Sequence, residues 1–243
     1  MLLAALGNSL LMAVHILLLT SPVFSQQSHN RNSPFFEAGI TAGPSNFLGD
    51  LGGNYGRGQT FLKDNNFPLT KLMTGAYIAF HPNNWLGLRL AVNNGKLEGD
   101  DGIIQGKGGL EEARKIRSTN FRTNLQEAFL AAEIYPTKIF ESSNSLLFFR
   151  LQPYGLLGVG VFHFNPQGKD PVTGQWVDLK PLHTEGQGFN EYPTRKEYAL
   201  TQINVPMGFG VKYLINEKVD LSFEVVHRKT FTDYIDDVST TYI

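Results

Sequence analysis

Several charged residues of this sequence alternate with apolar ones, and this pattern places charges on one face of an extended chain. Arg89, for example, lies between Leu88 and Leu90. Successive side chains of a strand point to opposite faces. We therefore expect seven charged side chains to face a common interior: Glu37, Arg89, Glu127, Glu133, Lys212, Glu224 and Arg228.

Ion pairing is the chemistry that this set of residues favours. It contains four acids and three bases, and a buried charge without a partner is costly. A small barrel has an interior just wide enough for its own side chains. We therefore predict that these residues brace the inside of a barrel, with a proton or ion path as the alternative.

Residues that could support catalysis lie near the predicted strand ends and in the loops. The candidates are His163, His183 and His227, with Asp178, Glu185 and Asp233 in neighbouring loops. No nucleophile elbow fixes a serine among them, and the histidine spacing matches no zinc motif. The acidic turn 98–102 could offer oxygen ligands to calcium, but it lacks the alternation of an EF-hand loop. We therefore predict no enzyme, no metal and no cofactor.

The composition excludes further classes of function. A formal net charge of −1 over 243 residues gives no field that would attract nucleic acid. The sequence has no cysteine, which removes disulfides, thiolate nucleophiles and thiolate metal sites. Hydrophobic residues make up 42% and charged residues 18%, and 18 Phe, 9 Tyr and 25 Gly accompany them. This mixture favours strands and tight turns, and it suits the aromatic girdles of a membrane barrel.

The strands that must position these side chains follow from the alternation of apolar and polar residues. The clearest segment is 201–214, where Ile203 and every second residue after it to Tyr213 are apolar. Segment 146–162 is apolar on both faces, so the sequence does not assign its inward side. The predicted strands cover 35–42, 72–80, 86–93, 121–135, 146–162, 201–214 and 219–229.

The connections between these strands alternate in length. Long connections at about 43–71, 96–120 and 164–197 are separated by short or medium ones at 81–84, 136–145 and 215–218. Outer-membrane barrels have short periplasmic turns and long extracellular loops. We therefore predict periplasmic docking turns at 137–145 and at seven named residues: His81, Pro82, Asn83, Asn84, Asn216, Glu217 and Lys218.

The first 25 residues have the features of a secretory signal peptide. Residues 10–19 form an apolar run interrupted only by His15, and Val23 and Ser25 suit a cleavage site before Gln26. The run is too short for a membrane-spanning helix, which needs about 20 residues. We predict a signal peptide at 1–25 and a barrel domain at 26–243.

Seven strands are one fewer than the even number of bacterial barrels, so we also predict that the last strand is missing through C-terminal truncation.

Several short motifs resemble one known family. In order they are SNFLGDL at 45–51, FHFNPQ at 162–167, WVDLKPL at 176–182, TEGQG at 184–188, YALTQ at 198–202 and RKTFTDYIDDVS at 228–239. Together they resemble the PorG-like outer-membrane β-barrels of Bacteroidetes, which are associated with the type IX secretion system. The resemblance covers roughly residues 34–243, and family members usually continue through a further loop and strand.

The resemblance implies an eight-stranded antiparallel transmembrane barrel in the outer membrane of a Gram-negative cell. It implies a non-enzymatic scaffold or docking component of type IX protein secretion, whose partners are a periplasmic ring lipoprotein and its partner subunits. A small-solute or lipid-binding barrel is the alternative, and an enzyme acting on lipids at the rim is a third. A soluble lipocalin-like barrel would instead turn its apolar face inward.

Overall fold

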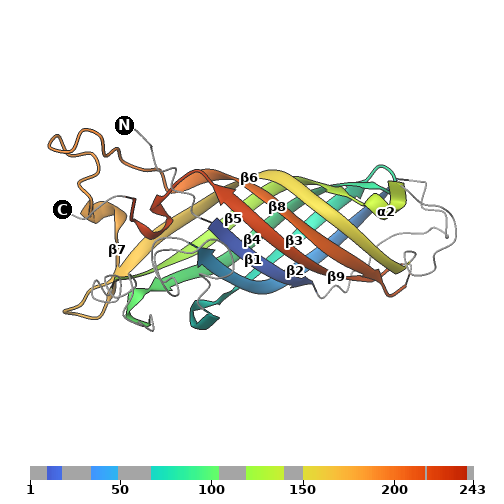
Figure 1. Ribbon diagram of the computed structural model, residues 1–243, viewed down its shortest axis with the longest axis horizontal. Coiled ribbons are helices and arrows are strands. Elements are labelled where there is room, and N and C mark those ends of the chain that lie inside the picture. The colour runs from blue at the N-terminus through green and yellow to red at the C-terminus, as the bar shows by residue number, and fades with distance from the viewer. Residues whose placement is uncertain are drawn as a thin grey trace, which may run out of the picture.

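The long elements of the protein are antiparallel strands. The computed structural model describes residues 10–17, 34–48, 67–103, 119–139, 150–216 and 218–239. Seven long strands pair in chain order: β2 (Phe35–Leu48), β3 (Lys71–His81), β4 (Leu86–Asp100), β5 (Asn120–Ile134), β6 (Leu151–Lys169), β8 (Thr201–Leu214) and β9 (Asp220–Thr230). They curl around one long axis into a barrel-like wall (Figure 1). The predicted all-β antiparallel fold is therefore confirmed.

Short elements complete the two ends of the wall. They are η2 (Phe67–Leu69), η3 (Asp101–Ile103), α2 (Pro136–Ile139), β7 (Trp176–Asp178), η4 (Lys180–Leu182) and η5 (Tyr234–Asp236). Among the described residues, no helix has the length and apolar character needed to cross a membrane. Figure 1 shows α2 at one end, which we call the turn end, and β7 with the long segment after it at the other, which we call the loop end.

An eighth strand, β1 (Leu10–Leu17), lies between the first and last of the seven. It pairs antiparallel with β9, where Val14 is the partner of Val225, and with β2, where Ala13 is the partner of Ser45. The pairings therefore run all the way round the wall. These residues belong to the predicted signal peptide, and they occupy the place where a missing strand was expected. An apolar extended segment is stabilised there because the backbone N–H and C=O groups of both edges need partners.

Three strands run further towards the loop end than predicted. The predicted ends at 42, 93 and 162 are wrong, because β2 reaches Leu48, β4 reaches Asp100 and β6 reaches Lys169. The cause is a change in polarity along each strand. On β4 the outward residues Lys96 and Glu98 are polar while the inward Leu97 is buried. The apolar residues thus change face, and the simple alternation ends before the strand does.

Asparagine side chains shape both short turns. The Oδ1 atom of Asn83 accepts hydrogen bonds from the backbone N–H groups of Trp85, at 3.2 Å, and Leu86, at 2.9 Å. Asn216 does the same for Lys218, at 2.8 Å, and Val219, at 3.0 Å. Such side-chain bonds replace backbone turn bonds and hold the chain reversal in place.

Candidate functional site

The outer surface of the wall is apolar along most of each strand. On β4, the outward Leu88, Leu90 and Val92 are 44%, 49% and 54% exposed, whereas the inward Arg89 is 1% exposed. The same holds on the other strands. The exposed apolar set includes Phe36, Ile40, Ile78, Leu130, Ile134, Leu157, Val159, Val161, Ile203, Phe209 and Phe223. Leu157, Val159 and Val161 also assign the outward face of β6, which the sequence left open.

Arg89 is the centre of a buried ion-pair group near the turn end. Its Nε pairs with Glu133, and its Nη1 donates to Glu224 Oε2 at 2.8 Å. The guanidinium also lies 4.4 Å from the centre of the Tyr77 ring. Two carboxylates from different strands, β5 and β9, therefore converge on one arginine of β4.

A second group, centred on Glu37, adjoins the first. Lys212 Nζ donates to both carboxylate oxygens of Glu37 at 2.7 Å. The Tyr77 hydroxyl donates to Oε1 at 2.6 Å, and His81 Nε2 lies 3.4 Å from Oε2. Tyr77 joins the two groups, because its ring contacts Arg89 while its hydroxyl holds Glu37.

Glu127, further towards the loop end, accepts four hydrogen bonds. Arg228 Nε donates to both oxygens at 2.8 and 2.9 Å. The side-chain amides of Asn204 and Asn93 donate at 2.6 and 2.7 Å. Such a carboxylate is fully satisfied by its partners, as a buried charge needs to be.

All seven charges of the predicted interior set thus lie inside the wall, and each is paired. The prediction omitted the neutral residues that complete the groups: Tyr77, His81, Asn93, Tyr135, Tyr154 and Asn204. Tyr154 donates to Glu224 at 2.7 Å, and Tyr135 donates to Glu133 at 2.6 Å. A signal was available for Asn93, Asn204 and Tyr135, each of which has the same parity as an inward charge on the strand that contains it or immediately precedes it. None of the seven charges lies on β3 or β6, so parity gave no such signal for Tyr77, His81 and Tyr154. Tyrosine also suits the outer girdle, so its residue type alone did not decide.

Beyond Glu127, the interior becomes apolar. Buried residues from four strands, from the segment before β8 and from η5 pack together: Met73, Leu97, Leu125, Phe162, Phe164, Tyr198 and Ile235. Ile235 belongs to η5, so the chain after β9 folds back across the mouth of the barrel. Val238 packs there against Phe121. Residues that follow β9 therefore fill part of the barrel interior at the loop end.

Polar contacts hold this closing segment in place. Thr184 Oγ1 donates to Asp237 Oδ2 at 2.6 Å, and the Tyr198 hydroxyl donates to the other oxygen. Burial raises the pKa of the Asp237 carboxyl, although these two hydrogen bonds lower it. Burial, and then the hydrogen bond to Asp237, raise the pKa of the Tyr198 phenol. The folded environment therefore shifts the pKa of both groups towards the neutral form.

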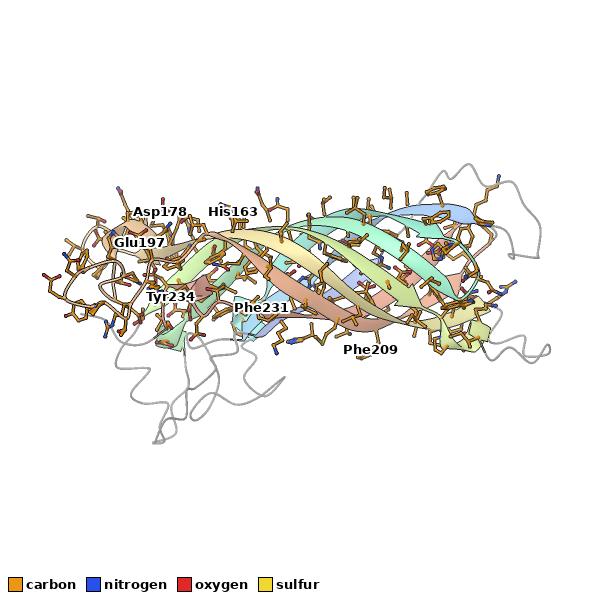
Figure 2. All side chains as sticks on the ribbon, turned by 90° about the horizontal axis from the view of Figure 1, so that it is seen from above. His163, Asp178, Glu197, Phe209, Phe231 and Tyr234 are labelled. Atoms are coloured by element: carbon orange, nitrogen blue, oxygen red, sulfur yellow. The ribbon has the colours of Figure 1, made fainter. Side chains whose placement is uncertain are left out.

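The histidines named as rim candidates are placed on separate elements. His163 lies on the outer wall, where its Nδ1 is 3.0 Å from Thr201 Oγ1. His183 lies in the long loop, 2.6 Å from the Gln187 carbonyl oxygen and 4.0 Å from Glu197. His227 lies on β9 with its ring partly exposed. Figure 2 shows His163, Asp178 and Glu197 towards the loop end. Over the described part of the chain, no group of His, Asp and Glu has the arrangement of a metal site.

The predicted docking turns lie at the opposite end. The His81 ring is buried, stacked on Phe35 at 4.4 Å, so this residue belongs to the interior. Asn216 and Lys218 are exposed, and Pro82, Asn83 and Asn84 are half-buried. Glu217 and part of the predicted turn 137–145 lie outside the described residues.

Comparison with known proteins adds no relative. No family model matches the chain, and no curated protein matches it.

Proposed function

We propose that this protein is an outer-membrane β-barrel that acts as a non-enzymatic scaffold or docking component of type IX protein secretion. One observation carries the membrane part of the proposal. Aliphatic side chains cover the outside while paired charges fill the inside. A soluble barrel needs the reverse arrangement, because exposed apolar surface is unfavourable in water.

The height of the apolar surface supports this placement. On β8, the outward residues from Ile203 to Tyr213 span ten residue steps. At about 3.3 Å per residue and a strand tilt of about 40°, they cover about 25 Å along the barrel axis. This is the height of the apolar band of outer-membrane barrels.

The reversal of polarity towards the loop end also supports the membrane placement and suggests which end faces outward. Beyond the band, the outward residues of β4 are Asn94, Lys96 and Glu98, and the inward Leu97 is buried. A part of the barrel that stands in water needs a polar outside and an apolar core. The loop end therefore corresponds to the extracellular side, and the turn end to the periplasm.

The filled interior favours a scaffold over a channel. Ion pairs occupy the turn half, apolar side chains occupy the loop half, and η5 lies across the mouth. The test is conductance of the full chain in planar bilayers, together with membrane partition and heat-modifiable gel mobility. We expect membrane partition without a steady pore. A protein that stays in the aqueous phase would reject the membrane placement, and a steady conductance would favour the solute-binding alternative.

The secretion role rests on the resemblance and predicts contacts at the turn end. We expect Asn84→Arg combined with Lys218→Glu to abolish co-purification with the periplasmic ring lipoprotein and its partner subunits. The matched control is Glu191→Lys, an exposed charge change in the loop-end segment. Retained co-purification of the turn variant would reject the docking role. It would not affect the proposal that the protein is a membrane barrel.

A further inference from the structure

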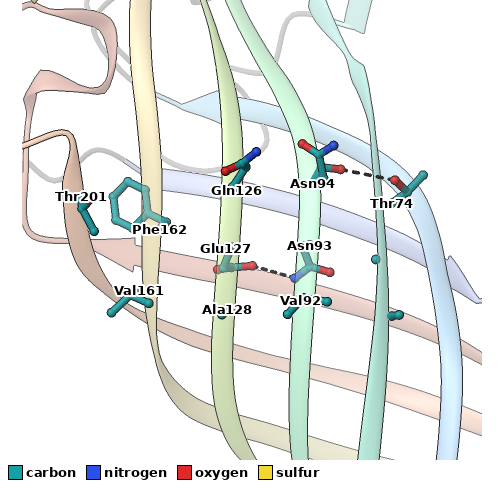
Figure 3. A pocket seen from close by; sticks show the side chains of 12 residues that line it. Thr74, Val92, Asn93, Asn94, Gln126, Glu127, Ala128, Val161, Phe162 and Thr201 are labelled. Carbon is teal, nitrogen blue, oxygen red and sulfur yellow. Dashed lines mark hydrogen bonds between the residues drawn. The ribbon is translucent and has the colours of Figure 1, made fainter.

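Two outer-wall strands change from apolar to polar at the same level. On β4 the change falls between Val92 and Asn94, and on β5 it falls between Ala128 and Gln126. Val92 and Ala128 are cross-strand partners, and so are Asn94 and Gln126. Figure 3 shows the two amides at one level and the aliphatic pair at the next.

The surface is hollowed at this boundary. A shallow, open hollow of about 660 Å³ is lined by the outward residues Asn94, Gln126, Val92, Ala128 and Val161, and by parts of the inward-pointing Asn93, Glu127 and Phe162. A second hollow of about 440 Å³ shares Ala128 and Val161 and continues to Leu90, Leu130 and Val159. We call the two together the outer groove. Its depth has a simple cause, because the short Ala128 side chain lies between its longer cross-strand partners Val92 and Val161.

The boundary residues differ from those usual at a membrane interface. Barrels place aromatic girdles there, and the turn end of this protein has exposed Phe36, Phe209, Tyr213 and Phe223. On β4 and β5 at the loop side, two amides take that place above an alanine. Amide groups at the edge of hydrocarbon favour a ligand that offers hydrogen-bonding groups at the same depth.

We propose that the outer groove binds one membrane lipid with an anionic headgroup. Its acyl chain lies in the apolar part, against Ala128, Val161 and Leu130. Its ester or amide carbonyls accept hydrogen bonds from the Asn94 and Gln126 amides. Lys96, the next outward residue after Asn94 on β4, is exposed and faces the headgroup phosphate. This inference rests on the proposed membrane placement.

The experiment fills the outer groove with a larger side chain and measures how many lipids stay bound to the protein. The full chain is reconstituted in vesicles of equal phosphatidylglycerol and phosphatidylcholine, and retained lipids are counted by native mass spectrometry. We expect one retained lipid, mainly phosphatidylglycerol, and at least a tenfold loss of it in Ala128→Phe. The control is Ala132→Phe, which also lies between aliphatic partners, Leu88 and Leu157, but outside the outer groove.

The headgroup contacts have their own variants. Gln126→Leu should reduce retention several-fold, whereas Asn124→Leu, the next outward residue on the same strand, should not. Lys96→Gln should remove the preference for phosphatidylglycerol while a lipid is still retained. If Ala128→Phe does not insert, the smaller Ala128→Leu serves in its place.

The outcomes separate this inference from the proposed function. Failure of the unchanged chain to enter vesicles would overturn the membrane placement and the lipid site together. Insertion with equal lipid retention in the unchanged chain and the groove-filling variant would overturn the lipid site alone.

Discussion

At the scale of single residues, the interior is organised around saturated carboxylates. Glu127 accepts bonds from Arg228, Asn204 and Asn93, and these partners come from three different strands. A buried ion pair adds little net stability over a well-packed apolar pair, but removing one partner leaves a charge stranded. The network therefore specifies which strands meet, more than it adds to the free energy of folding.

Removing the arginine of this group should be strongly destabilising. We expect Arg228→Met to lower the free energy of unfolding by about 3–5 kcal/mol, because Glu127 loses its counter-charge inside the barrel. Urea unfolding from vesicles measures the loss. The control is Lys229→Met, an exposed neighbour on the same strand. Adding Glu127→Gln to Arg228→Met should recover most of the loss, and no recovery would show that charge is not the cause.

The hydrogen-bonded group of Asp237, Thr184 and Tyr198 at the mouth should respond to acid. The pKa of folded Asp237 lies above that of an ordinary Asp, so the folded state holds this proton more tightly. The stabilising contribution is complete below about pH 4, the usual Asp pKa, and is lost as the pH rises through the raised pKa. We expect amide exchange at Ile235 and Val238, corrected for intrinsic rate, to slow between pH 7 and pH 4. In Asp237→Asn this pH dependence should be absent.

At the scale of strands, much was readable from the sequence. Alternation located six of the seven long strands and the inward face on which the charges lie, and an apolar run located β6. It failed at the strand ends near Leu97 and Phe164, where the apolar residues move to the other parity. Under the proposed membrane placement, such a change of parity marks the level at which a strand passes from hydrocarbon into water. The contacts of Tyr77 with Arg89 and Glu37 were beyond reach, since they depend on the register of β3 with its two neighbouring strands.

The asparagine turns give a prediction at this scale. We expect Asn83→Ala to lower the free energy of unfolding by about 1–2 kcal/mol, because two backbone N–H groups lose their acceptor. The expected change is a lower urea midpoint in vesicles with unchanged slope. Asn84→Ala, one residue along the same turn, is the comparison, and an equal loss there would contradict a role for the Asn83 side chain.

At the scale of the whole molecule, the ring of pairings depends on residues 10–17. The chain has no native cysteine, so disulfide trapping can report this strand without background. Cross-strand Cα atoms lie about 4.5–5.5 Å apart, within reach of a disulfide. We expect Val14→Cys with Val225→Cys to crosslink in the chain refolded with residues 1–25 attached. Val14→Cys with Leu221→Cys, which are not partners, should stay reduced.

The same pair tests export. In protein recovered from the outer membrane after removal of a signal peptide, the crosslink should be absent. A crosslinked product from that membrane would show that residues 10–17 remain as a structural strand, and the predicted signal peptide would then be wrong.

The packing of Ile235 in η5, and of Val238 after it, into the loop end of the barrel has a mechanical consequence. Ile235 and Val238 pack against interior side chains at the mouth, and they follow β9 after only a few residues. A pulling force applied at Ser239 would therefore act on Ile235 and Val238 before it reached the sheet. Tension at this one point would open the mouth at the loop end while the ladders of the wall stayed paired.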